Sequence, residues 1–368
     1  MKKVIVSICL VMCVSLFVTA QESSDKYMNA EYIESVLIKT AKWQVEHPKR
    51  RKRNEWTHAV FYAGLFSAWQ ATQSQMMYDE LMTMGNKTGW KPFRRWYHAD
   101  DIAICQTYLS LYDREKRMEM VQPSLDTLAR FVSESYPTKG IEVVKYWWAD
   151  ALFMAPPVLI KAGIMFGKCE YLKYNDQLYR EAYNLLYNKK ERLLHRDLSY
   201  TIKNDSTDKY EANGKPVFWA RGNGWVLAGL VKIMKELPAD YPERPFYKKL
   251  FKEMAKRIVE IQPVDGLWRP GLLDPDAYPH GEVSGSGLFC YALAYGVNSG
   301  LLRGKKYRLA AKKAWVGLNG CLNEEGRVGW VQGAAAGPST YLKADKWELY
   351  GTGAFLLAGS EMCKMAKE

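Results

Sequence analysis

The feature that most constrains the fold is a succession of helical periodicities along almost the whole chain. In residues 27–46, apolar side chains recur at Ile33, Val36, Leu37 and Ala41, close to the 3.6-residue period of an amphipathic helix. Similar stretches follow one another to the end of the chain. Together they make twelve expected helices: 27–46, 57–71, 73–84, 100–111, 116–135, 150–163, 171–188, 222–236, 245–262, 283–299, 305–318 and 346–367. The pattern predicts an all-α protein.

Expected strands are few and short. Residues 201–203 and 217–219 flank a polar turn at 204–214, so we expect a small hairpin there. Residues 329–332 form a further candidate strand.

The helices alternate in character, which suggests how they pack. Helices that follow aromatic, Asp-rich or Gly-rich loops alternate with helices that follow plain polar turns and carry Lys and Glu on their outer faces. Six inner and six outer helices, paired in sequence, predict a toroid of six hairpins, the (α/α)6 barrel. Helical hairpins also stack into open solenoids. The absence of a fixed repeat period favours the closed barrel.

Residues 1–20 have the pattern of a secretory signal peptide. Lys2 and Lys3 precede an apolar run at 4–18, and Ala20 ends a small-residue cleavage site. The run is shorter than the roughly 20 residues of a membrane-spanning helix. We therefore expect a secreted protein.

The remaining chain, 21–368, contains no linker-like segment, so we expect a single domain and no stable membrane insertion. Cys13 suggests the alternative of a lipoprotein, but Met12 before it is larger than a lipobox residue. The five cysteines beyond the signal peptide are widely spaced, with no CxxC pair or metal-ligand spacing: Cys105, Cys169, Cys290, Cys321 and Cys363. No metal and no cofactor are expected.

Charge and aromatic content point to the class of ligand. The net charge is +12, and about +10 without Lys2 and Lys3. A positive field attracts anionic small substrates such as uronic acids, and no nucleic-acid-binding module is present in the sequence, so no nucleic acid partner is expected. The 13 Trp and 24 Tyr side chains fill a core in part, and such residues also stack on sugars.

Candidate site residues gather at the expected starts of the inner helices. Helix N-termini present free N–H groups and the positive end of the helix dipole. If the inner helices point the same way, their starts form one ring. The candidates there are Trp56, His58, His98, Asp100, Asp101, Trp148, Asp150, Arg221, Asn223, Trp225, His280, Glu282 and Ser284.

Asp150 is the sharpest of these candidates because it follows Trp147 and Trp148. A carboxylate buried among aromatic rings loses hydration, so its pKa rises towards the range in which it can donate a proton. The alternative is that Asp150 only caps the next helix, a common use of aspartate.

The other candidates also have two interpretations. Of Asp100 and Asp101, one is expected to face the site and the other to cap the helix. Arg221, flanked by glycines, could hold a carboxylate in two hydrogen bonds or form a salt bridge with a neighbouring aspartate. Lone histidines such as His58 and His280 are more often structural, and His195 is expected on the outer face.

The two strongest motifs are residues 147–156 (WWADALFMAP) and 219–225 (WARGNGW). With 281–287 (GEVSGSG) and the aspartates after His98, they resemble glycoside hydrolase family 105, the unsaturated rhamnogalacturonyl hydrolases. The similarity spans about residues 56–330 and implies the (α/α)6 barrel. The related family 88 glucuronyl hydrolases, which act on glycosaminoglycan or gellan fragments, share this fold and reaction.

The resemblance implies removal of a 4,5-unsaturated uronic acid from the non-reducing end of an acidic, lyase-generated oligosaccharide, by hydration of the C4=C5 bond. Asp150 matches the general acid/base, and Asp100 is the better match to the second aspartate, with Asp101 left open. The expected substrate-binding residues are His58, Trp148, Trp219, Arg221, Trp225 and His280.

From the implied substrate we also expect a role in pectin degradation. Because this substrate is a short oligosaccharide, we expect the protein in the periplasm. The oligomeric state stays open between monomer and homodimer. Alternatives are a glucuronyl hydrolase acting on glycosaminoglycan or ulvan fragments, a non-catalytic helical glycan-binding protein, and an inverting glycosidase with a second carboxylate.

Overall fold

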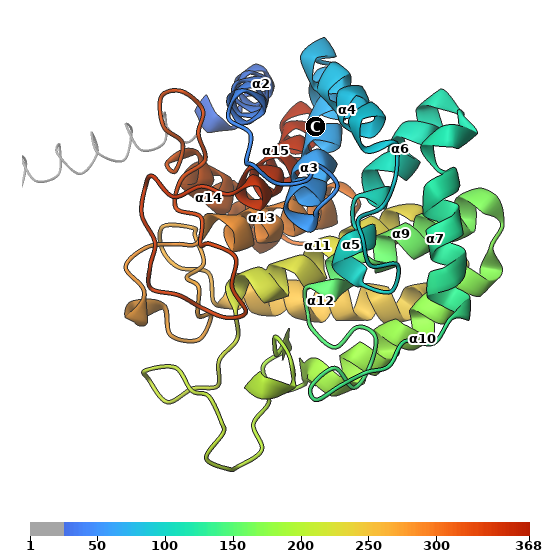
Figure 1. Cartoon of the computed structure of the whole chain (residues 1–368). Helices are drawn as coiled ribbons and strands as arrows, with labels where there is room; N and C mark the ends of the chain where they lie inside the picture. Colours follow the sequence, from blue (N-terminus) through green and yellow to red (C-terminus); the bar gives the residue numbers. More distant parts are fainter. Residues whose placement is uncertain (1–25) are drawn as a thin grey trace, which may run out of the picture.

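The computed structural model describes residues 26–368, so the expected signal peptide at 1–20 lies outside the described part. Helices dominate the described chain, in agreement with the all-α prediction (Figure 1). None of these helices combines the length and the apolar character needed to cross a bilayer.

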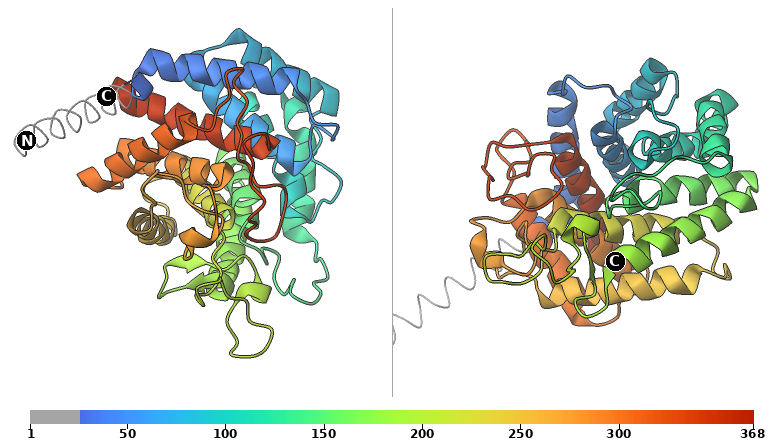
Figure 2. Two further views of the ribbon diagram at one scale, coloured as in Figure 1. Left: turned by 90° about the vertical axis from the view of Figure 1, so that its left-hand side faces the viewer. Right: turned by 60° about the horizontal axis from the view of Figure 1, so that its bottom comes forward.

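Six long helices form an inner ring within residues 26–368. They are α3 (Trp56–Thr72), α6 (Cys105–Glu115), α9 (Pro156–Phe166), α11 (Ala220–Glu236), α13 (Val283–Asn298) and α15 (Leu349–Lys367). Each contacts the next in this order, and α15 packs against α3 to close the ring. Figure 2 shows the consequence, because the red C-terminal helix lies beside the blue N-terminal helices.

Six further helices of the described chain alternate with these and lie outside them. They are α2 (Ala30–Glu46), α4 (Gln75–Thr88), α7 (Gln122–Ser133), α10 (Cys169–Leu186), α12 (Arg244–Glu260) and α14 (Lys305–Asn319). Each outer helix is amphipathic, and α10, for example, buries Leu178 and Tyr179 while Lys173 and Arg180 face solvent. Inner helices are buried on nearly every side, as in α13 and α15. The (α/α)6 barrel is confirmed, and each of the twelve expected helices overlaps one of these twelve long helices.

Two inner helices approach each other closely through glycines. A Cβ atom on Gly64 of α3 would lie 2.3 Å from the carbonyl oxygen of Gly353 in α15. Any side chain there would push the two backbones apart, so glycine permits this contact.

Two expected helices are divided. The segment expected at 150–163 forms α8 (Ala151–Met154) and then α9, because Pro156 and Pro157 cannot supply the N–H groups of a continuous helix. The segment expected at 100–111 begins as α5 (Ala99–Ile102) and resumes as α6. Three 3-10 turns complete the helices of residues 26–368: η1 (Met118–Met120), η2 (Leu198–Tyr200) and η3 (Pro275–Ala277).

The expected hairpin is wrong. The strands of the described chain are β1 (Tyr187–Asn188) and β2 (Leu193–Leu194), which pair antiparallel. The segment at 201–203 is instead held in a loop, where the Asp208 carboxylate accepts hydrogen bonds from the backbone N–H groups of Lys203 and Asn204. Trp219 forms a bridge with Gly271.

Residues 329–332 also form no strand. Gly329 donates its N–H to Cys321, and the neighbouring bridge joins Leu322 to Val328. A long irregular loop therefore runs from 329 to the start of α15.

Candidate active site

Residues from the C-terminal halves of α3, α11, α13 and α15 line one cavity. These inner helices therefore begin together at the opposite end of the barrel, called the entry end below. The loops before α5, α8, α11 and α13 carry the expected site residues to this end. The opposite end, where the inner helices finish, is called the far end.

Asp150 immediately precedes α8, and its side chain makes no capping hydrogen bond. Its Oδ2 atom is buried without a hydrogen-bond partner in the described structure, and the side chain is 14% exposed. The capping interpretation therefore does not account for Asp150, whose carboxyl is free for another role.

Arg196 is the cation beside Asp150, with Nε 3.7 Å from Oδ2. Its guanidinium lies over the ring of Trp147 and donates to Asp197 at 2.6 Å. The Arg196 carbonyl accepts from the N–H of Ala149 at 2.8 Å. This backbone bond ties the loop that carries Arg196 to the loop that carries Asp150.

Sequence reasoning missed Arg196 and Asp197, and it placed His195 wrongly. His195 is 5% exposed and stacks on Phe218 with ring centroids 4.5 Å apart, so it does not lie on the outer face. The segment is drawn inwards because Asn223 of α11 exchanges hydrogen bonds with both the N–H and the carbonyl of Leu194. The sequence signal that could have indicated them is a pair of adjacent charges, Arg196 and Asp197, shortly after the apolar Leu193 and Leu194.

Asp100, and not Asp101, is the free aspartate of the pair. Asp101 is buried and accepts three hydrogen bonds from Arg95: from its backbone N at 2.7 Å, Nε at 3.1 Å and Nη2 at 2.6 Å. Asp100 is 22% exposed and has His98 Nδ1 3.8 Å from its Oδ2. Burial lowers the pKa of His98 to about 4, so its ring is neutral and accepts from the Asp100 N–H.

The two free carboxyls influence each other's protonation. Burial raises the pKa of Asp100 to about 7, and the negative charge of Asp150 acts in the same direction. Burial also raises the pKa of Asp150, against the opposing charges of Arg196 and Arg221. At neutral pH the pair can therefore retain a proton that isolated aspartates would have lost.

Aromatic rings surround these carboxyls. Trp148 is 3% exposed, with its ring centroid 4.9 Å from that of His98 and 4.7 Å from that of Trp147. Low polarity around Asp100 and Asp150 is the physical cause of their raised pKa values.

Arg221 is committed to the protein itself. It is 1% exposed, and its guanidinium donates to the carbonyls of Gln332 at 2.7 Å and Gly333 at 2.9 Å. Its ring neighbours are Trp219 and Tyr350, with the guanidinium carbon 4.4 Å and 4.9 Å from their centroids. In this arrangement Arg221 fastens the loop before α15 to the entry end and adds positive charge near Asp150.

The remaining predicted binding residues lie in different surroundings. Trp219 is buried and donates from Nε1 to Gln332 at 3.3 Å. Trp225 has no exposed surface and packs on Phe153 with centroids 4.9 Å apart. The expectation that Trp225 shapes the pocket wall needs correction, because its position one turn into α11 directs the ring into the core.

The two predicted substrate-binding histidines, His280 and His58, also lie in different surroundings. His280 is half-buried and stacks on Trp330 with centroids 3.9 Å apart. His58 is buried beside Tyr62 and lines a small cavity with Arg51 and Arg53. Burial lowers the pKa of His58 to about 4.

Within residues 26–368, no group of three or more His, Cys, Asp or Glu side chains is placed to hold a metal ion. The five cysteines of this part are free, and all except Cys169 are buried.

The profile of Glycosyl Hydrolase Family 88 matches residues 26–366. This chain belongs to that family. The family 88 chain is accordingly a glycoside hydrolase. It is 43% identical over 355 residues to the unsaturated 3S-rhamnoglycuronyl hydrolase of Formosa agariphila, with 93% of each chain covered.

Solved structures agree on the fold of this family 88 hydrolase. A structure named as a polysaccharide lyase is 28% identical, with a TM-score of 0.84 over 92% of this chain and 98% of the other. A possible member of family 105 from Salmonella enterica serovar Paratyphi A is 18% identical, with a TM-score of 0.75 over 91% and 94% of the two chains. The likeness to the second structure concerns the fold alone.

Proposed function

We propose that this hydrolase removes a 4,5-unsaturated uronic acid from the non-reducing end of lyase-generated oligosaccharides. The single observation that carries this proposal is the Asp100–Asp150 pair. Both side chains are largely buried, keep some exposure at the entry end and have no capping or salt-bridge role apart from the contact with Arg196. Such a pair can hold and release one proton near neutral pH.

In the proposed reaction, Asp150 donates its proton to C4 of the unsaturated ring. The positive charge that develops at C5 and the ring oxygen is captured by water, whose proton returns to Asp150. The resulting hemiketal at C5 opens, and the glycosidic bond then breaks to release the shortened oligosaccharide. One carboxyl serves both proton transfers, so the reaction needs no paired nucleophile of the kind that ordinary retaining glycosidases use.

Asp100 and Arg196 have opposite effects on the proton of the pair in this proposal. Repulsion between the Asp150 and Asp100 charges favours keeping one proton on the pair, and Arg196 stabilises the Asp150 carboxylate that remains after proton transfer. His98 and Trp148 complete the wall beside Asp100, while Trp219 and Arg221 position the loop at 332–333. His280 and His58 stay as proposed substrate contacts, with His280 the more accessible.

The name of the Formosa agariphila relative points to the sugar next to the bond. That protein is named as an unsaturated 3S-rhamnoglycuronyl hydrolase, and we infer a rhamnose unit in the leaving group of this chain too. The rhamnogalacturonan fragments of pectin and unsaturated glucuronyl fragments of glycosaminoglycans or ulvan are the alternative substrates. A signal peptide at 1–20 and a short substrate together suggest secretion to the periplasm.

The test is the absorbance near 235 nm of purified protein with unsaturated rhamnoglycuronyl and rhamnogalacturonyl disaccharides in parallel. The conjugated C4=C5 bond absorbs there, so hydration lowers the signal. We expect a falling trace that Asp150→Asn slows by at least about 100-fold, the usual contribution of a general acid. Asp240→Asn, at an exposed aspartate without a partner in the described structure, is the matched control and should keep full activity.

Whether the absorbance near 235 nm falls or rises distinguishes hydration of the C4=C5 bond from the main alternative, its formation by elimination. A polysaccharide lyase, which is the name of one similar structure, creates the same conjugated bond and raises the absorbance with an uncleaved polymer. A rising trace on polymer with no fall on unsaturated disaccharides would replace hydration with elimination. An Asp150→Asn variant as active as the Asp240→Asn control would remove Asp150 from the mechanism.

A further inference from the structure

A polar cavity lies at the far end of the barrel, and Asp150 is not among the residues that line it. It has a volume of about 450 Å³ and is lined by the C-terminal halves of α3, α11, α13 and α15 with parts of α6 and α9. Lys232 in its wall follows Arg221 by three turns of α11, which is about 16 Å along the helix axis. The cavity is therefore separate from the entry end.

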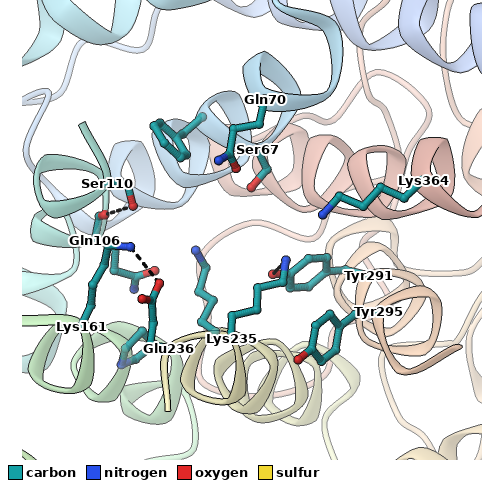
Figure 3. Close-up of a pocket in the computed structure, with 13 residues that line it drawn as sticks. Ser67, Gln70, Gln106, Ser110, Lys161, Lys235, Glu236, Tyr291, Tyr295 and Lys364 are labelled. Atoms are coloured by element: carbon teal, nitrogen blue, oxygen red, sulfur yellow. Dashed lines mark hydrogen bonds and ion pairs between the residues drawn. The ribbon is translucent and has the colours of Figure 1, made fainter. Parts of the chain in front are cut away.

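Four lysines from three inner helices converge on this cavity. Figure 3 shows the side chains of Lys161, Lys235 and Lys364 around it, and Lys232 belongs to the same lining. Two carboxylates oppose this charge. Glu236 pairs with Lys161 at 2.8 Å, and Glu361 pairs with Lys235 at 2.6 Å and with Lys364 at 3.2 Å.

Of these four lysines, Lys232 is the one without a carboxylate partner in the described structure. In residues 26–368 its ammonium has no carboxylate within 4.0 Å and no hydrogen-bond partner, and its described contact is with the ring of Phe153 at 5.7 Å. Burial lowers the pKa of Lys232 to about 7, with Lys235 and Lys161 acting in the same direction and Glu236 opposing them. Lys232 is half-buried in the cavity wall, beside the like charges of Lys235 and Lys161. Charges withdrawn from water are normally paired, so an anion held in the cavity would supply the partner that Lys232 lacks.

Lysines at this end could instead serve to neutralise the carbonyls of the six helix ends. The contacts of the lysines do not indicate that they neutralise these carbonyls. In the described structure none of the four lysines donates to a backbone carbonyl, and those with partners bind Glu236, Glu361 or the Tyr291 hydroxyl. Their ammonium groups are directed to the side chains around the cavity.

The rest of the lining suits an oxyanion with a sugar attached. The Gln70 amide supplies a neutral donor. The Ser67 and Ser110 hydroxyls donate to the carbonyls of Ala63 at 3.2 Å and Gln106 at 2.8 Å, and the rings of Tyr291 and Tyr295 form an aromatic side. We propose that the far-end cavity binds a tetrahedral oxyanion, sulfate or phosphate, as the free ion or carried on a saccharide. The anion would complete the charge balance of Lys232 and bridge α9, α11 and α15.

Isothermal titration calorimetry of the full chain with sodium sulfate, at ionic strength held constant with sodium chloride, tests this proposal. We expect saturable binding to wild type and to Asp150→Asn, and at least about 10-fold weaker binding to Lys232→Met. Lys313→Met, which removes an exposed lysine of outer helix α14, is the matched control and should bind like wild type. Equal affinity of Lys232→Met and wild type, or loss of binding in Asp150→Asn, would overturn the far-end site.

A second measurement covers the case in which Lys232→Met folds poorly. Acetylation of the wild-type chain at pH 8, followed by peptide mass spectrometry, should modify Lys232 and should slow when sulfate is present. Lys313 in the same sample should be modified at an unchanged rate. Equal rates at Lys232 with and without sulfate would contradict the proposal.

Parallel titrations distinguish the source of the anion. Inorganic phosphate, glucose 6-sulfate and plain glucose are compared with sulfate on wild type and Lys232→Met. Tighter binding of glucose 6-sulfate than of sulfate identifies a saccharide as the carrier. Equal or weaker binding identifies the free ion. Binding of plain glucose that Lys232→Met does not change would contradict recognition of an anion.

Discussion

At the scale of single residues, the chemistry depends on which carboxyls remain free. Asp101 resembles Asp100 in sequence, yet Arg95 occupies it with three hydrogen bonds. Asp197 is likewise occupied by Arg196. Asp100 and Asp150 are left to exchange protons, in surroundings that disfavour two simultaneous negative charges.

Asp100 should determine the alkaline side of the pH–activity profile. Its pKa is raised to about 7, so the pair loses its last proton as the pH rises through 7 and kcat/KM should fall there. In Asp100→Asn the like charge is gone, Asp150 deprotonates at lower pH, and the fall should shift to lower pH. An alkaline limb that stays in place, or moves up, would contradict the coupling of the two carboxyls.

The same shift has a consequence for stability. The folded chain binds more protons than the unfolded chain between the ordinary aspartate pKa of about 4 and about 7. The contribution of Asp100 to the free energy of unfolding therefore decreases as the pH rises through this window. Urea unfolding of Asp100→Asn should show a smaller decrease than wild type over the same range.

At the scale of helices, the barrel requires close packing of neighbours and irregular entry segments. Pro156 interrupts the expected helix at 150–163 and leaves α8 as a separate turn directly after Asp150. The carboxyl thus lies at the edge of the ring instead of within a continuous helix.

The contact of α3 with α15 should be sensitive to a single methyl group. Gly64→Ala would place Cβ against the Gly353 carbonyl at 2.3 Å, and both groups belong to helix backbones that cannot yield locally. We expect a loss of about 1–3 kcal/mol in the free energy of unfolding, measured by urea denaturation. Gly333→Ala, where a Cβ meets nothing within 4 Å, should cost far less, and equal losses in the two variants would contradict the packing argument.

At the scale of the whole molecule, the ring is closed by its last helix. Helix α15 packs against α3, α13 and α2, and nearly all of its residues are buried. The first and last described helices, α2 and α15, thereby pack in one core.

A chain that ends at Trp347 should consequently fail to fold cooperatively. Without α15, the apolar faces of α3 and α13 would be exposed to water, and the Tyr350 ring beside Arg221 would be absent. We expect loss of the thermal unfolding transition and binding of a hydrophobic dye. Removing Lys367 and Glu368 alone is the control, because their charges are largely exposed and such pairs contribute little.

The helix order, the inner–outer alternation and the candidate Asp150 followed from the sequence, because periodicity and local motifs are properties of short segments. The choice of Asp100 over Asp101, the inward position of His195 and the burial of Trp225 depended on partners distant in sequence. Arg196 reaches Asp150 only because Ala149 binds its carbonyl and Asn223 holds Leu194. Local sequence patterns specify which helices form, whereas the tertiary structure of the closed ring determines which charged side chains come into contact.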